Sequence, residues 1–157
     1  MKILGIDPGS IVTGYGVVEE EQKQLKLITC GAIKTPSKAT LQDRLKLIYE
    51  GITQVLKEHQ PQIVSIEEVF YARNIQAVLK LGHARGVILL AAANTGIPIV
   101  EYSPRKVKQA VTGNGAASKE QVKRAVGQIL IMPDEKLRYD VTDALAIAIC
   151  HCHRINY

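Results

Sequence analysis

A short apolar strand that ends in an acid is the feature that most constrains the fold of this chain. Ile3–Ile6 is apolar apart from one glycine, Asp7 follows it directly, and Pro8-Gly9 ends the strand in a turn. In open α/β sheets, ligands bind at the carboxyl ends of the strands, which is where this pattern puts Asp7. A carboxylate beside a buried strand needs hydrogen-bond donors or a cation to offset its desolvation. Asp7 is therefore either the cap of a structural turn or an acid of a functional site.

The order of the predicted elements indicates an α/β fold with a five-stranded mixed sheet flanked by helices. Three consecutive strands, at residues 3–6, 13–18 and 25–33, have short connections and are expected to form an antiparallel meander. Two later strands, at 63–66 and 97–102, each follow a helix and are expected to run parallel to the first. A length of 157 residues fits one domain over residues 1–157.

The helical segments follow from apolar periodicity and from capping residues. Helices are expected from about Thr40, from Asn74 to Asn94, and from Pro104, Ser118 and Tyr139. In the second of them Gly82 and Gly86 stand one turn apart. Because glycine weakens a helix interior, this spacing predicts close helix packing, either within the fold or against another subunit.

The composition limits the compartment and the partner. No apolar run is long enough to span a bilayer, the first residues do not resemble a secretion signal, and the three cysteines favour a reducing compartment. We therefore expect a cytoplasmic protein without membrane contact. Residues 1–72 carry 8 Lys/Arg and 9 Asp/Glu, whereas residues 73–157 carry 12 and 6. The basic second half predicts a polyanionic partner such as nucleic acid, or is an ordinary solvated face.

Three further acids stand in positions comparable to that of Asp7, at a strand end or at a helix start. Glu67 follows the strand at 63–66, and Asp140 and Asp143 stand three apart in the first turn of the last helix. Acids in a first turn are also favoured by the helix dipole, so this pair has an ordinary structural explanation as well. Gathered at one sheet edge, four carboxylates would need divalent cations, and oxygen ligands suit Mg²⁺ or Mn²⁺. Two such ions, about 3.5–4 Å apart, support phosphoryl displacement. An acid cluster with a basic flank predicts a metal-dependent nuclease.

The sequence blocks around these acids resemble the RuvC family, the bacterial Holliday junction endonucleases, which have an RNase H-like fold. The resemblance lies in Gly5–Ser10, Thr13–Val17, Ile66–Phe70 and Asp140–Ala148, and it covers nearly the whole chain in collinear order. It implies a homodimer that nicks two opposing strands of a four-way DNA junction, during recombination and repair. It also implies a branch-migration motor as a partner, and a place at the bacterial nucleoid.

The resemblance also assigns roles to individual residues. It implies that Asp7, Glu67, Asp140 and Asp143 are the catalytic acids and hold two Mg²⁺ ions, with Mn²⁺ able to substitute. The third position is Asp here, whereas some members of the family have His. Phosphodiester hydrolysis would leave 5′-phosphate and 3′-hydroxyl ends.

The DNA-binding residues rest on weaker patterns. Phe70 matches an aromatic that the family stacks on unpaired bases, although a core aromatic is the ordinary alternative. Lys108 and Lys119 match basic positions that the family places on phosphate. Arg73, Arg85 and Arg105 are DNA-binding candidates from their charge alone.

Three other functions are compatible with parts of the sequence. An actin-like ATPase also opens with Asp-x-Gly after a first strand, but 157 residues cannot supply its two lobes. Cys150–His153 contains four metal-ligand side chains, but neighbours on a helix point apart, which favours an ordinary helix end over a zinc site. The alternative to a nuclease is a non-catalytic module that binds branched or structured nucleic acid, which leaves the acids without a role.

Overall fold

The computed structural model describes residues 1–69, 73–132 and 137–155. Within these residues the sheet has five strands in the order β3-β2-β1-β4-β5. Strand β1 pairs antiparallel with β2 and parallel with β4, β2 pairs antiparallel with β3, and β4 pairs parallel with β5. The predicted mixed sheet is confirmed. The strands are β1 Lys2–Asp7, β2 Val12–Glu21, β3 Gln24–Lys34, β4 Ile63–Glu67 and β5 Ile99–Tyr102.

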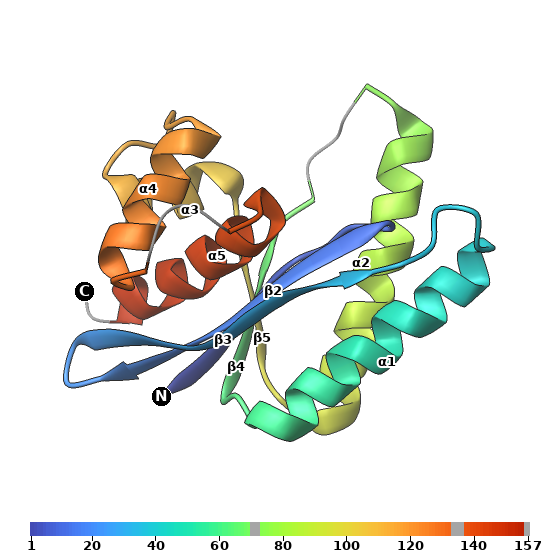
Figure 1. Ribbon diagram of the computed structural model, residues 1–157, viewed down its shortest axis with the longest axis horizontal. Helices are drawn as coiled ribbons and strands as arrows, with labels where there is room; N and C mark the ends of the chain where they lie inside the picture. The colour runs from blue at the N-terminus through green and yellow to red at the C-terminus, as the bar shows by residue number, and fades with distance from the viewer. Residues whose placement is uncertain (70–72, 133–136, 156–157) are drawn as a thin grey trace.

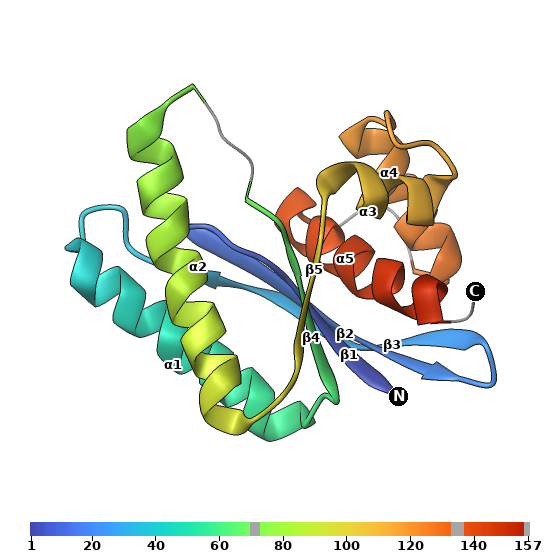
Figure 2. The same cartoon turned by 180° about the vertical axis from the view of Figure 1, so that it is seen from behind.

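Helices cover both faces of this sheet (Figure 1, Figure 2). Helices α1 and α2 lie on one face, whereas α5 lies on the other with α3 and α4 packed against it. The side chains of Thr40, Asn74, Ser103 and Ser118 cap the first four helices, and the capping roles of Thr40 and Ser118 are those that the sequence predicted. The helices are α1 Leu41–His59, α2 Ile75–Thr95, α3 Pro104–Thr112, α4 Lys119–Ile129 and α5 Tyr139–Ile155.

The two apolar layers of the core follow from the alternation of side chains along β1. Ile3 packs with α3, α4 and α5, whereas Leu4 and Ile6 pack with α1 and α2. All three side chains are fully buried. A strand that is apolar on both faces needs a helical layer on each side, which is why β1 lies in the middle of the sheet.

Glycines let α5 lie directly on the sheet. A Cβ atom built at Gly5 would stand 2.0 Å from the carbonyl oxygen of Ala144, and one at Gly14 would stand 2.0 Å from that of Asp140. Any larger residue at these positions would push α5 away. The backbone of α5 thus approaches Gly14 closely, and this contact fixes the first turn of α5 near the carboxyl end of β1.

Candidate active site

The first two acids of the site come from neighbouring parallel strands. Asp7 is the last residue of β1 and Glu67 is the last residue of β4. The parallel register pairs Ile6 with Ile66, so each acid follows a paired residue at the same edge of the sheet. Arg85, on α2, steadies this edge, since its Nε lies 3.4 Å from the backbone oxygen of Glu67.

The third acid comes from α5 and completes one cavity. Asp143 lines a cavity of about 260 Å³ together with Asp7 and Glu67. Asp140, one turn earlier, is close enough to Asp7 to act on its pKa. The carboxylate of Asp140 is paired with Arg138 at 3.2 Å, and Asp140 is not among the residues that line the cavity. The structure thus brings three of the four predicted acids together, with the fourth beside them.

Two lysines complete the rim of the cavity. Lys108 lies one turn into α3 and Lys119 is the first residue of α4, which Ser118 and Gln121 start with a capping box. The Nζ of Lys119 lies 3.7 Å from a carboxylate oxygen of Asp143. The remaining lining is largely apolar, from Pro104, Val107, Val122 and Ala146. Helices α3 and α4 therefore supply positive charge directly opposite the acids.

Burial and mutual repulsion raise the pKa values of the three acids that line the cavity. Burial, with repulsion from Asp143, Glu67 and Asp140, raises the pKa of Asp7 to about 8, and Lys119 only partly opposes this shift. Burial also raises the pKa of Glu67 and that of Asp143, against the nearby lysines. Asp7 is therefore largely protonated at neutral pH unless a cation replaces its proton.

The donor atoms of this site fit a hard divalent cation. Its ligand-type side chains are all carboxylates, the donors that Mg²⁺ and Mn²⁺ prefer. Among the residues that the structure describes, no three His, Cys, Asp or Glu side chains stand close enough to hold an ion together. Two of the acids are engaged by Lys119 and Arg138 instead. Carboxylate rotation away from these basic partners is what metal binding requires.

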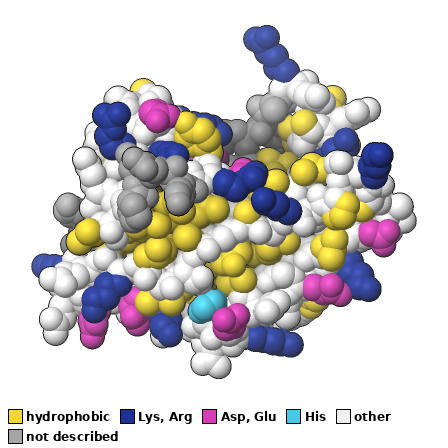
Figure 3. Space-filling model, in the orientation of Figure 1, with side chains coloured by type: hydrophobic (Ala, Val, Ile, Leu, Met, Phe, Trp, Pro, Cys, Tyr) yellow, Lys and Arg dark blue, Asp and Glu magenta, His cyan; other side chains and the backbone are white. Residues whose placement is uncertain are grey.

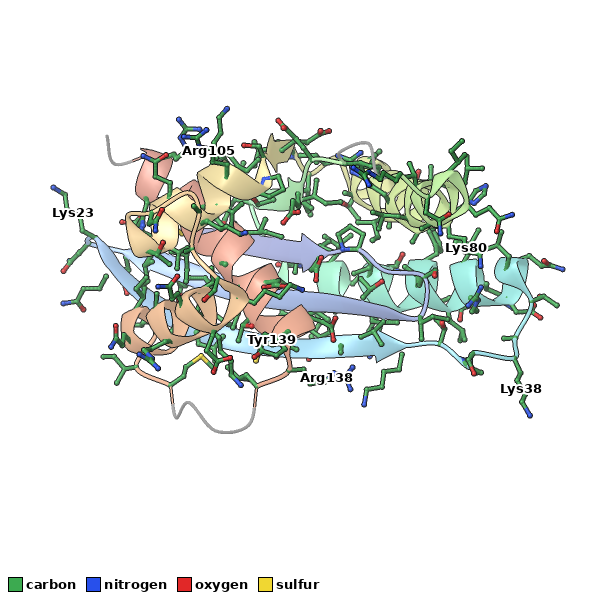
Figure 4. All side chains as sticks on the ribbon, turned by 90° about the horizontal axis from the view of Figure 1, so that it is seen from above. Lys23, Lys38, Lys80, Arg105, Arg138 and Tyr139 are labelled. Carbon is green, nitrogen blue, oxygen red and sulfur yellow. The ribbon has the colours of Figure 1, made fainter. Side chains whose placement is uncertain are left out.

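The predicted DNA-binding arginines differ in their surroundings. Arg73 and Arg105 are exposed, and Arg105 projects from α3 (Figure 4). Arg85 is partly buried and forms an ion pair of 2.9 Å with Glu101, so the described contacts of this side chain lie within the protein. Phe70 lies outside the described residues. Figure 3 shows Lys and Arg side chains spread over the visible face of the molecule rather than gathered in one patch.

Sequence reasoning did not single out Arg138. Its Nε and Nη2 both donate to the same oxygen of Asp140, at 3.3 and 3.2 Å. The next residue, Tyr139, donates its hydroxyl proton to Glu120 and lies under the Nζ of Lys123, 5.4 Å from the ring centre. The sequence does contain one indication that Arg138 is unusual. It is a basic residue placed just before a helix, where the helix dipole disfavours a cation.

The Cys150–His153 segment makes separate contacts along α5. His151 Nδ1 lies 2.8 Å from the hydroxyl of Tyr102, and His153 Nδ1 lies 2.8 Å from the carbonyl oxygen of Ala110. The thiol of Cys150 lies 3.8 Å from the carbonyl oxygen of Lys106. These contacts tie the end of α5 to β5 and α3.

Comparison with known proteins agrees with this arrangement. A family model described as crossover junction endodeoxyribonuclease RuvC matches residues 3–151. The RuvC of Pelotomaculum thermopropionicum is 43% identical over 157 residues, which cover all of this chain and 96% of the relative. The structure of Thermus thermophilus RuvC in complex with a Holliday junction substrate is 35% identical and superimposes with a TM-score of 0.92, over 99% of this chain and 94% of that one.

A more distant likeness supports the fold alone. The yeast mitochondrial resolvase Ydc2 is 12% identical and has a TM-score of 0.69 over 96% of this chain and 78% of its own. The sheet order and the helices on both faces are thus those of the RNase H-like resolvases. From the family match and the full-length identity, the chain belongs to the RuvC family of crossover junction endodeoxyribonucleases.

Proposed function

We propose that this protein resolves Holliday junctions by nicking two opposing strands, in bacterial recombination and DNA repair. The observation that carries the proposal is the cavity in which Asp7, Glu67 and Asp143 face Lys108 and Lys119. A phosphodiester is an anion that these lysines can attract, and the acids can hold the cations that its hydrolysis needs. The active site would lie in a single domain over residues 1–157, in the cytoplasm at the nucleoid.

Nucleases of this family depend on divalent metal ions. We assign Asp7, Glu67, Asp140 and Asp143 as the residues that hold two Mg²⁺ ions, with Mn²⁺ as a substitute. Bound there, such ions would supply the activation of a water molecule and the stabilisation of the leaving oxygen. The oxygen-only donor set and the raised pKa of Asp7 support the assignment, because buried acids that repel one another gain most from a cation.

The protein's own groups orient the substrate. Lys108 and Lys119 would contact phosphate oxygens on either side of the scissile bond, and their charge draws DNA into the cavity. The apolar lining from α3 and α4 limits water around the acids and so strengthens every charge interaction in the site. The products would carry 5′-phosphate and 3′-hydroxyl ends.

A homodimer would present two such sites to the two-fold symmetric junction. Supporting this, α2 carries an exposed apolar stripe that we call the α2 stripe. A Cβ built at either of its glycines meets no atom of the described residues within 4 Å, apart from those of its own helical turn. Of the two packing partners that these glycines allowed, a second subunit is therefore favoured. The α2 stripe consists of Ile75, Leu79, Gly82, Gly86 and Leu90.

The apolar character of α2 has a second explanation. Among the described helices, α2 is also the one whose length and composition would allow it to cross a membrane, a weak criterion that core helices of soluble proteins also meet. Buried Ala84 and Ile88, packed in the core with α1, favour the soluble explanation. A branch-migration motor remains an expected partner.

Junction cleavage by the Asp7→Asn variant tests the proposal. The amide is nearly isosteric but has no charge to hold a metal ion, so cleavage in Mg²⁺ should fall below detection. Binding to a four-way junction should persist, because the phosphate contacts lie on other residues. The control variant is Asp43→Asn on α1, an exposed acid away from the cavity, which should cleave normally.

The substrate comparison separates this function from its alternative. The wild-type protein should place symmetric nicks in a four-way junction and leave a linear duplex of the same sequence intact. Binding without metal-dependent cleavage would instead establish the non-catalytic module. Full turnover by Asp7→Asn would remove Asp7 from the site.

A further inference from the structure

The start of α5 carries a cation where helix electrostatics favour an anion. Arg138 directly precedes α5, and its carbonyl oxygen accepts hydrogen bonds from the amides of Val141 and Thr142, both at 3.1 Å. The exposed amides of a helix N-terminus carry partial positive charge, so a guanidinium there is disfavoured. Departures of this kind from local preference are expected mainly where function requires them. Another contact must account for Arg138.

That contact is the ion pair with Asp140. Both Nε and Nη2 of Arg138 donate to Oδ2 of Asp140, and the two side chains are 50% and 35% exposed. Asp140 is the one proposed metal-site acid that does not line the cavity. One of the two carboxylate oxygens of Asp140, Oδ2, is therefore engaged by Arg138 in the free protein.

The backbone between these two residues is anchored. The hydroxyl of Tyr139 donates to Glu120, Lys123 lies over its ring, and the carbonyl oxygen of Tyr139 accepts from the hydroxyl of Thr142 at 3.0 Å. Figure 4 shows Arg138 and Tyr139 together at the start of α5. Separation of Arg138 from Asp140 would therefore occur by side-chain rotation, without movement of the helix.

We propose that Arg138 is a positioning residue with two alternative partners, Asp140 in the free protein and a DNA phosphate in the complex. A guanidinium binds carboxylate and phosphate through the same pair of donors, so a phosphate can replace the carboxylate. Its arrival would release Asp140 toward Asp7. The inference rests on the proposed function, because it needs Asp140 to be a metal-site acid. By thermodynamic reciprocity, DNA and metal ions then strengthen each other's binding.

Mn²⁺ affinity of the DNA-free protein tests the first partner. Mn²⁺ titrations followed by electron paramagnetic resonance compare the wild type, Arg138→Gln, Asp140→Asn and the double variant. Loss of an exposed ion pair should raise the Mn²⁺ affinity of Arg138→Gln about two- to fivefold. Asp140→Asn should lower the affinity, and Arg138→Gln should then have no further effect. The matched control is Lys123→Gln, which removes one positive charge nearby without touching the acids, and should change the affinity less.

The outcomes separate the inference from the function beneath it. Arg138→Gln could raise the Mn²⁺ affinity equally with Asp140 and with Asp140→Asn, or Lys123→Gln could raise it as much as Arg138→Gln does. Either result would show that Arg138 acts only through its positive charge and would overturn the inference. A loss in Asp140→Asn without any gain in Arg138→Gln would overturn it too, while leaving the proposed function intact. Unchanged affinity in Asp140→Asn would overturn the metal role of Asp140, and the inference with it.

Junction binding in EDTA tests the second partner. Arg138→Gln should lower the slope of log affinity against log salt by about one, as expected for one lost phosphate contact. Arg138→Lys keeps the charge and should keep the slope, which also excludes misfolding as the cause. An unchanged slope in Arg138→Gln would show that no phosphate takes this side chain, and would overturn the inference.

Discussion

At the scale of residues, the site is a set of acids that oppose one another until cations arrive. Asp7 ends a fully buried strand segment, and burial is the largest cause of its raised pKa. Lys119 neutralises Asp143 in part, at 3.7 Å, but it lies 72% exposed and is free to exchange partners. The acids therefore destabilise the metal-free fold at the position where metal ions and phosphate are proposed to bind.

The first prediction concerns the stability of the metal-free protein against pH. The pKa of Asp7 is about 8 in the folded chain, against 3.8 for an ordinary aspartate, so the folded state holds the proton more tightly. Stability from this group is complete below about pH 4 and is lost as pH rises through 8. In EDTA at pH 8, Asp7→Asn should therefore be more stable than the wild type, by on the order of 3 kcal/mol.

Urea unfolding at pH 5 and pH 8 measures this difference. The advantage of Asp7→Asn should shrink at pH 5, and saturating Mn²⁺ should reverse it by stabilising only the wild type. An advantage that is equal at both pH values would assign it to a cause other than titration.

The second prediction concerns the lysines of the cavity. Lys108→Ala and Lys119→Ala should each weaken junction binding and lower its salt slope by about one unit per lost phosphate contact. Lys23→Ala is the control, since Lys23 lies on the turn between β2 and β3, far from the cavity (Figure 4). Slopes at the wild-type value would make both residues ordinary surface charges.

Which side chains could be predicted from sequence depended on how local their context is. Asp7 and Glu67 were identifiable because an acid that ends an apolar strand is a pattern of a few adjacent residues. The inward contact of Arg85 was not, because its partner Glu101 lies on β5 and becomes a neighbour only in the folded sheet. Arg138 is local to Asp140, but only the structure reveals that the two side chains are paired and that Asp140 is not among the residues lining the cavity.

At the scale of elements, the site depends on how closely α5 approaches β1 and β2. Gly5 and Gly14 admit backbone oxygens of α5, and Ser65 on β4 donates a hydrogen bond of 3.1 Å to Ile147 in the same helix. The sequence contains the two glycines that make this close approach possible. It could not say which helix fills the space, because that choice depends on long-range packing.

The third prediction is that Gly14→Ala damages both stability and cleavage. The new Cβ would meet the carbonyl oxygen of Asp140 at 2.0 Å, and because that atom is backbone, the first turn of α5 must shift. A cost of about 3 kcal/mol is expected in urea unfolding. Cleavage per folded molecule should also fall, since Asp140 moves with the turn. In Gly82→Ala the new Cβ meets no described atom beyond its own helical turn, so the fold of one subunit should tolerate it, and any effect should be confined to the subunit contact proposed for the α2 stripe.

At the scale of the whole molecule, the helical layer formed by α1 and α2 leaves apolar side chains of α2 exposed. Helix α1 and the inner side of α2 pack on the sheet, whereas Ile75, Leu79 and Leu90 of the α2 stripe are 73, 57 and 53% exposed. The sequence predicted close packing at the two glycines but left the partner open. The fold favours the proposed second subunit, because it leaves that face of α2 without a neighbour from the described chain.

The last prediction tests whether a second copy covers the α2 stripe. Leu79→Glu puts a charge at the middle of the stripe, where a dimer would have to bury it unpaired, so the dimer should dissociate. The matched control is Leu47→Glu on α1, since Leu47 is a leucine of comparable exposure, 40%, on the neighbouring helix. Analytical ultracentrifugation should give the mass of one chain for Leu79→Glu and of two chains for Leu47→Glu.

The same pair of variants links the dimer to coordinated cutting. Leu79→Glu leaves the acids and lysines of the cavity unchanged, so a monomer should still bind Mn²⁺ with wild-type affinity. On a four-way junction it should nick single strands without pairing the cuts, because one chain carries only one site. A Leu79→Glu protein that remains dimeric and makes paired nicks would place the subunit interface elsewhere. Monomeric protein with paired nicks would show instead that junction symmetry can be met by two independent chains.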